Sequence, residues 1–88
     1  MSYNIENLKK KIRYRSNYRG TKEMDNLLSS FVDTIIEKID EHDLVKLLQL
    51  LDLDDENIFK FYKNIKTDVI VDDNEITRMF KDFKLKKL

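Results

Sequence analysis

The sequence contains no cysteine, no proline and no tryptophan, and its 88 residues include one glycine and one histidine. Without cysteine, a disulfide framework and a thiolate metal site are excluded, and His42 alone cannot form a histidine cluster. Without proline, a helix meets no internal breaker. No segment approaches the roughly 20 apolar residues of a membrane span, and the first residues lack the apolar run of a signal peptide. We therefore expect a bacterial cytoplasmic protein that is not inserted into a membrane.

The small size of the chain argues against an enzyme. A domain of 88 residues buries only roughly 60–65% of the surface that its unfolded form exposes. A deep, water-excluding active site is hard to build in that volume, because its walls and supporting residues are already needed for the core. The best carboxylate pair is Glu23 with Asp25, but residues two apart on a helix point in different directions. We therefore expect no catalytic residues and no metal site.

The formal net charge is zero, but the charges are unevenly placed. Residues 1–22 carry a net charge of +6, residues 23–57 of −9 and residues 58–88 of +3. Such a polarised surface can orient a charged partner, although solvated helix faces give the same pattern. The basic segment contains Tyr14 and Tyr18, and also Tyr3, which could stack on bases. Because the acidic centre would repel phosphate, we expect no nucleic-acid binding.

Apolar residues recur with helical spacing along the whole chain. The expected helices cover approximately residues 4–16, 21–39, 41–52, 55–65 and 73–85. Asp40 is predicted to cap the third helix, Asp72 with Glu75 to form a capping box at the fifth, and Ile65 to lie on the apolar face of the fourth. Stripes of Leu, Met and aromatic residues are typical of a core. We predict an all-α fold, a compact five-helix bundle forming a single small domain over residues 1–88.

The only glycine, Gly20, lies between the first two helices. In the simplest interpretation it ends the first helix, and Thr21 caps the second. The neighbouring charges favour another interpretation, in which Arg19 projects at the rim of the turn and Glu23 is close enough to pair with it or with a ligand. A glycine at this position lets the surface of a partner approach the backbone closely. The turn is therefore a candidate docking site.

This turn resembles a known motif. Arg19-Gly20-Thr21-Lys22-Glu23 is similar to the Arg-Gly-x-x-Glu motif of the succinate dehydrogenase flavinylation factors, the FAD assembly factor family. As in that family, a Leu-rich helix follows, here Met24-Asp25-Asn26-Leu27-Leu28-Ser29-Ser30-Phe31. A second stretch, Asp54-Asp55-Glu56-Asn57-Ile58-Phe59-Lys60-Phe61, resembles the family's acidic turn leading into Leu-Phe-x-Trp. The resemblance spans residues 5 to about 65.

The chain departs from the family pattern at four positions. Tyr18 stands where the family often has a second basic residue, and Arg15, one helical turn earlier, could compensate for it. Thr21 replaces a frequent Met, Glu56 a frequent Pro, and Phe61 the usual Trp. The last exchange keeps an aromatic ring for packing.

The resemblance implies a five-helix bundle that promotes the bond between FAD and a histidine of the flavoprotein subunit of succinate dehydrogenase, or of fumarate reductase. It implies no stably bound cofactor, since the factor acts on the FAD of its partner. Arg19, Gly20 and Glu23 would form the partner-binding surface, with Asp25, Arg15 and Tyr18 beside them. The alternative is a helical protein–protein interaction module unrelated to flavin.

Overall fold

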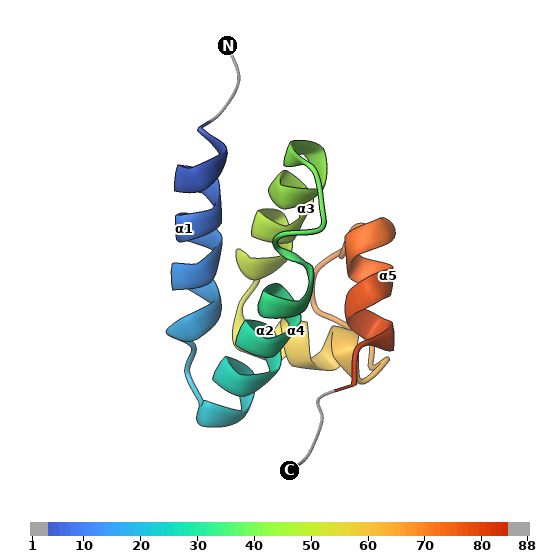
Figure 1. Ribbon diagram of the computed structural model, residues 1–88. Helices are drawn as coiled ribbons and strands as arrows, with labels where there is room; N and C mark the ends of the chain where they lie inside the picture. Colours follow the sequence, from blue (N-terminus) through green and yellow to red (C-terminus); the bar gives the residue numbers. More distant parts are fainter. Residues whose placement is uncertain (1–3, 85–88) are drawn as a thin grey trace.

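The structure, a computed structural model, describes residues 4–84. Within this range the chain forms five helices and no strand (Figure 1). They are α1 (Ile5–Asn17), α2 (Lys22–Ile35), α3 (Glu41–Leu51), α4 (Asp55–Tyr62) and α5 (Glu75–Asp82). Helix α1 packs against α2 and α3, while α5 packs against α3 and α4. The radius of gyration, 12.5 Å, is close to the about 12 Å expected of one compact domain of this length. The predicted all-α bundle is confirmed.

The apolar stripes of the five helices meet in one core. Its buried residues are Leu8, Ile12, Met24, Leu27, Leu28, Phe31, Val32, Ile35, Ile36, Leu44, Leu47, Leu50, Leu51, Ile58, Ile76 and Phe80. The ring of Phe31 in α2 lies 5.1 Å from that of Phe80 and 5.4 Å from that of Phe83, measured between centroids. Burying one such side chain stabilises the fold by about 1.5–3 kcal/mol. These rings therefore hold α5 against the N-terminal half of the bundle.

Helix α2 is shorter than predicted. It ends at Ile35, although the apolar stripe continues to Ile39. Beyond the helix the chain tightens into a turn, in which the N–H of Lys38 donates to the carbonyl of Ile35 at 2.9 Å. The turn keeps Ile36 fully buried and Ile39 half-buried, and it redirects the chain toward Asp40. The apolar spacing thus continues past the end of the helix because side chains of the turn also pack into the core.

Helix α4 also ends before the predicted residue 65. Asn64 has a φ of 62°, a left-handed conformation that asparagine adopts more readily than most residues. The N–H of Ile65 then donates to the carbonyl of Lys60 at 2.7 Å, which closes the helix end in the manner of a Schellman motif. As a result, Ile65 is 52% exposed, and its predicted place on the buried face is wrong.

The start of α5 differs from the prediction. The predicted capping box of Asp72 with Glu75 is wrong, because Asn74 and Thr77 form it. The Oδ1 atom of Asn74 accepts the N–H of Thr77, and the Oγ1 atom of Thr77 accepts the N–H of Asn74, both at 2.9 Å. The helix therefore begins at Glu75, two residues later than expected.

The bounds of α1 and α3 follow the prediction. Asp40 caps α3 by accepting the N–H of Asp43 at 2.9 Å. The bounds of α1 and α3 lie within one residue of those expected. Helix α5 ends at Asp82, whereas its predicted end, residue 85, lies outside the described residues.

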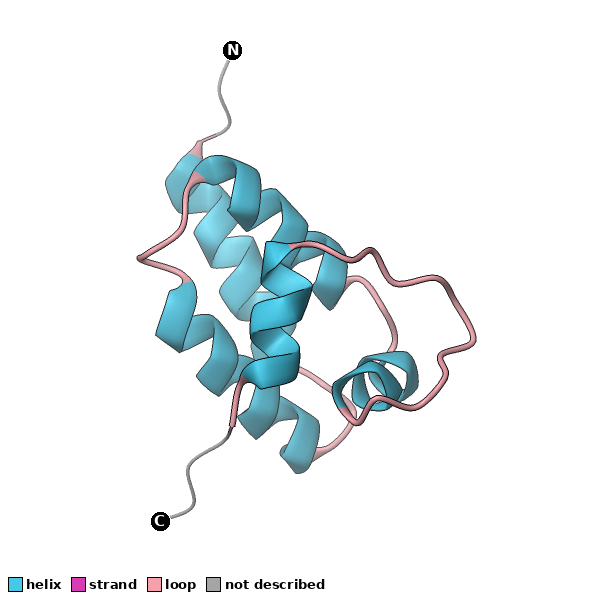
Figure 2. Cartoon of the chain, turned by 90° about the vertical axis from the view of Figure 1, so that its right-hand side faces the viewer, coloured by secondary structure: helices cyan, strands magenta, loops and turns pink. Residues whose placement is uncertain are grey.

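The longest connection, residues 63–74, runs along the outside of the bundle between α4 and α5 (Figure 2). Within residues 4–84, no helix has the length and apolar character needed to cross a membrane.

Candidate functional site

The turn between α1 and α2 consists of residues 18–21. Tyr18 is the C-cap residue of α1. Thr21 is the N-cap residue of α2, and its Oγ1 atom accepts the N–H of Met24 at 3.1 Å. Replacing such a cap costs about 1 kcal/mol, so the start of α2 is fixed locally. Only Arg19 and Gly20 lie between the two caps. The candidate motif therefore sits at the point where the chain reverses direction.

The side chain of Arg19 is almost fully engaged by other parts of the chain. Its Nε atom donates to Oδ1 of Asp55 at 2.7 Å. Its Nη1 atom donates to the carbonyls of Arg15 and Leu51, both at 3.0 Å, and Nη2 donates to the carbonyl of Leu53 at 2.9 Å. The side chain is 10% exposed. The guanidinium thus supplies donors to carbonyls at the ends of α1 and α3, which lack partners within their helices.

This arrangement corrects the sequence-based interpretation of Arg19. The prediction that it projects at the rim of the turn is wrong, because its guanidinium points into the junction of α1, α3 and α4. Among residues 4–84, its ion pair is with Asp55 and not with Glu23. Glu23 is exposed and makes no hydrogen bond or ion pair within that range. The two charged residues of the motif therefore have different surroundings.

Gly20 is tied to the same carboxylate. Its N–H donates to Oδ2 of Asp55 at 2.6 Å, so that Asp55 bridges the backbone of Gly20 and the side chain of Arg19. A Cβ atom at position 20 would lie 2.8 Å from Oδ2 of Asp55, closer than such contacts allow. Gly20 does not have a positive φ. The position therefore favours glycine because of space, and not because of backbone conformation.

Asp25 completes the set of bonds that hold the turn. Its Oδ1 atom accepts the backbone N–H of Arg19 at 2.5 Å across the turn. We call Arg19, Gly20, Asp25 and Asp55 the turn clamp. Because Asp25 faces the turn whereas Glu23 lines a groove, the two carboxylates do not converge on one point. This geometry is unsuited to acid–base chemistry on a shared substrate.

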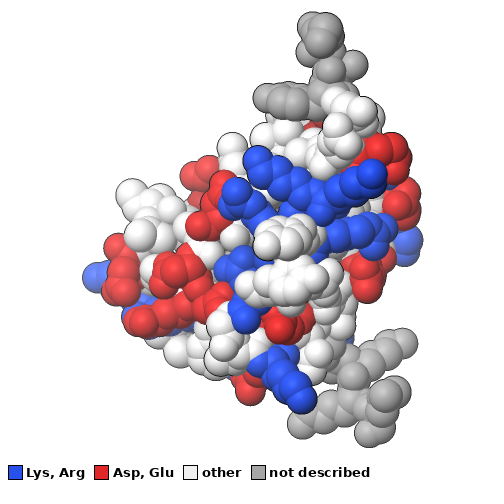
Figure 3. Space-filling view, turned by 90° about the vertical axis from the view of Figure 1, so that its left-hand side faces the viewer, with Lys and Arg blue, Asp and Glu red and all other residues white. Residues whose placement is uncertain are grey.

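The remaining candidates lie on the α1 side of the turn. Arg15 forms an ion pair with Asp52, with both side chains partly exposed. Tyr18 is 74% exposed and its ring contacts that of Tyr14 in a tilted arrangement, with 4.7 Å between the centroids and 44° between the ring planes. Lys and Arg side chains gather over this face of α1 (Figure 3). Tyr3, the third tyrosine of the basic segment, lies outside the described residues.

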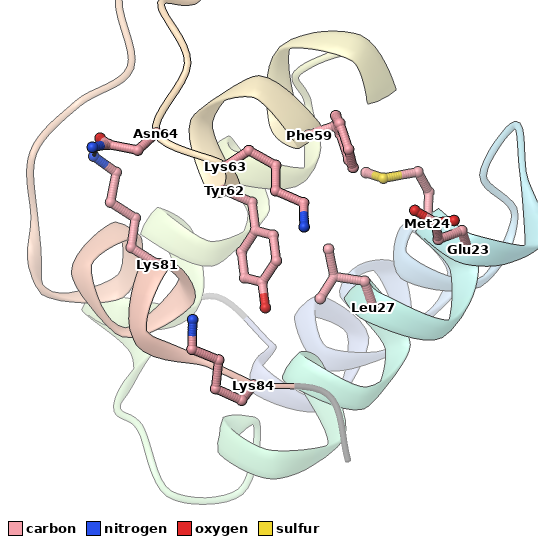
Figure 4. A pocket seen from close by; sticks show the side chains of 9 residues that line it. All are labelled: Glu23, Met24, Leu27, Phe59, Tyr62, Lys63, Asn64, Lys81 and Lys84. Atoms are coloured by element: carbon pink, nitrogen blue, oxygen red, sulfur yellow. Dashed lines mark hydrogen bonds between the residues drawn. The ribbon is translucent and has the colours of Figure 1, made fainter. Parts of the chain in front are cut away.

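On the other side of the turn lies a hollow surface. A groove of about 910 Å³ runs between α2, α4 and the end of α5 (Figure 4). A smaller hollow of about 400 Å³ lies beside it, next to Asp55. Glu23, Met24 and Phe59 line both. The turn and the groove therefore form one continuous surface.

The site offers little to a metal ion. Within residues 4–84, no three His, Asp or Glu side chains are placed to hold one. The carboxylate of Asp55, which contacts the turn, already accepts hydrogen bonds on both oxygens.

Comparison with known proteins decides the family. The Sdh5 family model, flavinator of succinate dehydrogenase, matches residues 10–84. The chain belongs to this flavinator family. Both stretches that resemble the family, Arg19–Glu23 and Asp54–Phe61, lie within the matched range. No curated protein and no solved structure matches the chain. Flavinators are assembly factors, so the chain has a role in the assembly and flavinylation of succinate dehydrogenase.

The sequence did not predict the contacts of Asp55 with the turn between α1 and α2. Asp55 was recognised as part of an acidic turn, but its bonds to Arg19 and Gly20, which lie 36 and 35 residues away, were not predicted. A signal was present, since two adjacent aspartates follow the Leu-rich third helix.

Proposed function

We propose that the chain binds the flavoprotein subunit of succinate dehydrogenase through the turn between α1 and α2, and so promotes covalent attachment of FAD to that subunit. The observation that supports this most is the turn clamp. Asp55 fixes both the side chain of Arg19 and the backbone of Gly20, so the exposed turn has one conformation before it meets a partner. Preorganisation of this kind lowers the entropic cost of binding.

The clamp divides the candidate residues into two groups. Gly20, Glu23 and Tyr18 are exposed and are proposed to contact the partner. Arg19 and Asp25 are proposed to act indirectly, because their polar atoms already hold the turn. The bond between FAD and the partner is made by groups of the partner and the flavin. The role of this chain is to hold the partner in a productive geometry, which lowers the entropic barrier to the reaction.

The test is co-expression of the succinate dehydrogenase flavoprotein subunit with the wild-type chain, with variants of it, or alone. Covalent flavin is read as in-gel fluorescence after denaturation. The informative variant is Glu23→Lys, because this exposed carboxylate has no partner within residues 4–84 and its reversal leaves the clamp intact. We expect fluorescence to rise with the wild type and to fall at least several-fold with Glu23→Lys.

Glu75→Lys is the matched control. Glu23 and Glu75 are both exposed glutamates in the first turn of a helix, so the two reversals change the helix dipole interaction similarly. We expect Glu75→Lys to behave as the wild type. If the two variants gave equal fluorescence, docking through the turn would be wrong. If the wild type gave no more fluorescence than the subunit alone, the alternative, an interaction module unrelated to flavin, would replace this proposal.

Gly20→Arg adds a second test. The atom that blocks a side chain here is the end of the Asp55 side chain, not the core, so the bundle should fold while the turn opens. We expect native-like circular dichroism and loss of partner binding. The same series with the fumarate reductase flavoprotein subunit compares the two enzymes that the family resemblance suggests.

A further inference from the structure

The groove beside the turn has an apolar floor. Met24 and Leu27 of α2 face Phe59 and Tyr62 of α4 across it (Figure 4). Met24 and Leu27 are buried, whereas the two aromatic side chains are half-buried and still accessible from the groove. The volume of about 910 Å³ is at the upper end for a ligand pocket, and it is enough for several side chains.

The rim of the groove is basic on one side. Lys63, Lys81 and Lys84 line it on the side of α4 and α5, and Glu23 is the acidic residue in its lining. The Nζ atom of Lys63 lies 5.7 Å from the ring centroid of Phe59 and 5.8 Å from that of Tyr62. This ammonium group therefore reaches over the apolar floor.

These three lysines have no carboxylate within 4.0 Å in the described part of the chain. The neighbouring Lys60 differs, since it pairs with Glu56 at 3.0 Å and with Asp68 at 3.4 Å. The Nζ atom of Lys81 contacts neutral groups, lying 3.3 Å from Oδ1 of Asn64. The groove thus combines apolar surface with lysines that form no ion pair among the described residues, although Lys81 is also attracted by the more distant carboxylate of Asp73.

We infer that this groove receives an apolar segment bearing acidic side chains, and that the segment belongs to the flavoprotein subunit; the inference rests on the proposed function. Apolar side chains of the segment lie on Met24, Leu27 and Phe59, and its carboxylates lie near Lys63 and Lys84. Charge complementarity of this type selects the partner and its orientation. Since Glu23 and Met24 also line the hollow beside the turn, one partner surface can cover both sites.

A charge-reversal pair tests the groove. Lys63→Glu/Lys84→Glu places two carboxylates at the rim, and Lys38→Glu/Lys66→Glu places two at exposed positions outside the groove lining. Each double variant changes the net charge from zero to −4, because each Lys→Glu replacement changes it by two. The two double variants therefore have the same net charge. The probe is the purified flavoprotein subunit, and the readout is its Kd for each full-length variant, with circular dichroism confirming the fold.

We expect the groove variant to bind at least about tenfold more weakly than the control, with a shallower dependence on salt. A photoreactive benzoylphenylalanine in place of Lys63 identifies the occupant. We expect its cross-link to fall on a segment of the subunit that contains both apolar and acidic residues.

The outcomes separate this inference from the proposed function. If both double variants bound the subunit equally while Glu23→Lys failed to bind, the groove inference would be wrong and docking through the turn would stand. A cross-link to a segment without acidic residues, or a small apolar anion bound to the purified chain in a native mass spectrum, would also overturn it. If the wild-type chain did not bind the subunit at all, both proposals would fail.

Discussion

Two connections between helices of this bundle are held in place in different ways. The turn of residues 18–21 is short, and side chains of the adjacent helix α2 and of the distant helix α4 hold it: Asp25 accepts the N–H of Arg19, and Asp55 accepts the N–H of Gly20. The connection of residues 63–74 is three times as long, and in its middle, residues 66–71, Asp68 alone forms hydrogen bonds to other parts of the described chain. Its main anchor is the buried Asn57, whose Oδ1 atom accepts the N–H of Asp68 at 2.8 Å. Ile70, at its outer edge, is 94% exposed.

The difference shows which of the two connections is held more firmly by side chains. Charge-assisted hydrogen bonds are shorter and roughly twice as strong as neutral ones. In the short turn they fix backbone and side chain together, at 2.5–2.7 Å for the bonds to Asp25 and Asp55. A loop with few bonds and exposed backbone opens at low cost, whereas a clamped turn opens only with its network. The stretch that resembles the family motif, Arg19–Glu23, begins in the clamped connection and continues into α2.

The largest expected effect comes from removing the clamp. Arg19→Met keeps the length and apolar stem of the side chain, but it leaves Oδ1 of Asp55 and the carbonyls of Leu51 and Leu53 without the donors that Arg19 supplies. We expect the free energy of unfolding to fall by about 2–4 kcal/mol, since partly buried polar groups lose their partners. Urea unfolding measures this change. Amide hydrogen exchange should show the N–H of Gly20 becoming unprotected at the same time.

Arg78→Met is the matched control for that prediction. Arg78 pairs with Asp73 at 2.9 Å, but both side chains are largely exposed. Exposed pairs of this type contribute about 0–1 kcal/mol. If Arg19→Met destabilised the chain no more than Arg78→Met, the clamp would not be a stabilising network, and the contrast between the two connections would disappear.

A smaller effect is expected at the anchor of the long connection. Asn57→Ala removes the acceptor of the Asp68 N–H and the donor to Asp54. We expect a loss of about 1–2 kcal/mol, the usual cost of neutral hydrogen bonds broken at a buried site. Exchange of the Asp68 amide should become faster, while the Gly20 amide stays protected. The exposed Asn26→Ala serves as control, and faster exchange at both amides in Asn57→Ala would mean that the connections open together.

The sequence predicted the helices and the core because both depend on local spacing. Apolar residues at helical intervals have only one way to be buried together, so the stripe of α2 and the rings of α5 could be assigned without coordinates. The errors fall at helix ends. Ile39 and Ile65 continue an apolar stripe, yet a tight turn and the left-handed Asn64 end the helices before them. Which of several Asp, Asn and Thr residues caps a helix also depends on tertiary contacts, as the Asn74–Thr77 box shows.

The position of the site was predictable, but the roles of its residues were not. A lone glycine with charged neighbours located the turn. That Arg19 points inward depends on carbonyls at Leu51 and Leu53, which reach the turn only when α3 packs against α1. The reason for glycine is likewise non-local, since it is the carboxylate of Asp55 that occupies the space of a side chain. Sequence spacing carries no information about such contacts.

The smallest predicted effect is a pH dependence at the base of the long connection. The side-chain amide of Asn57 donates to Asp54 at 2.6 Å and lowers the pKa of that carboxyl below its ordinary value of 3.8. Because the folded pKa is the lower one, the ionised form contributes stability at pH values above 3.8, and this contribution is lost as the pH falls through the folded pKa. An NMR titration of the carboxyl carbon of Asp54 measures the shift directly.

Asn57→Ala should return the pKa of Asp54 toward 3.8. Asp73 is the internal reference in the same titration, since Arg78 lowers the pKa of its carboxyl and Asn57 does not contact it. Its pKa should therefore stay low in the variant. If the pKa of Asp54 remained equally low without the amide, the backbone N–H groups of Asp54 and Asn57, followed by the charge of Lys60, would be what lowers it, and the side-chain tie between Asn57 and Asp54 would not be the cause.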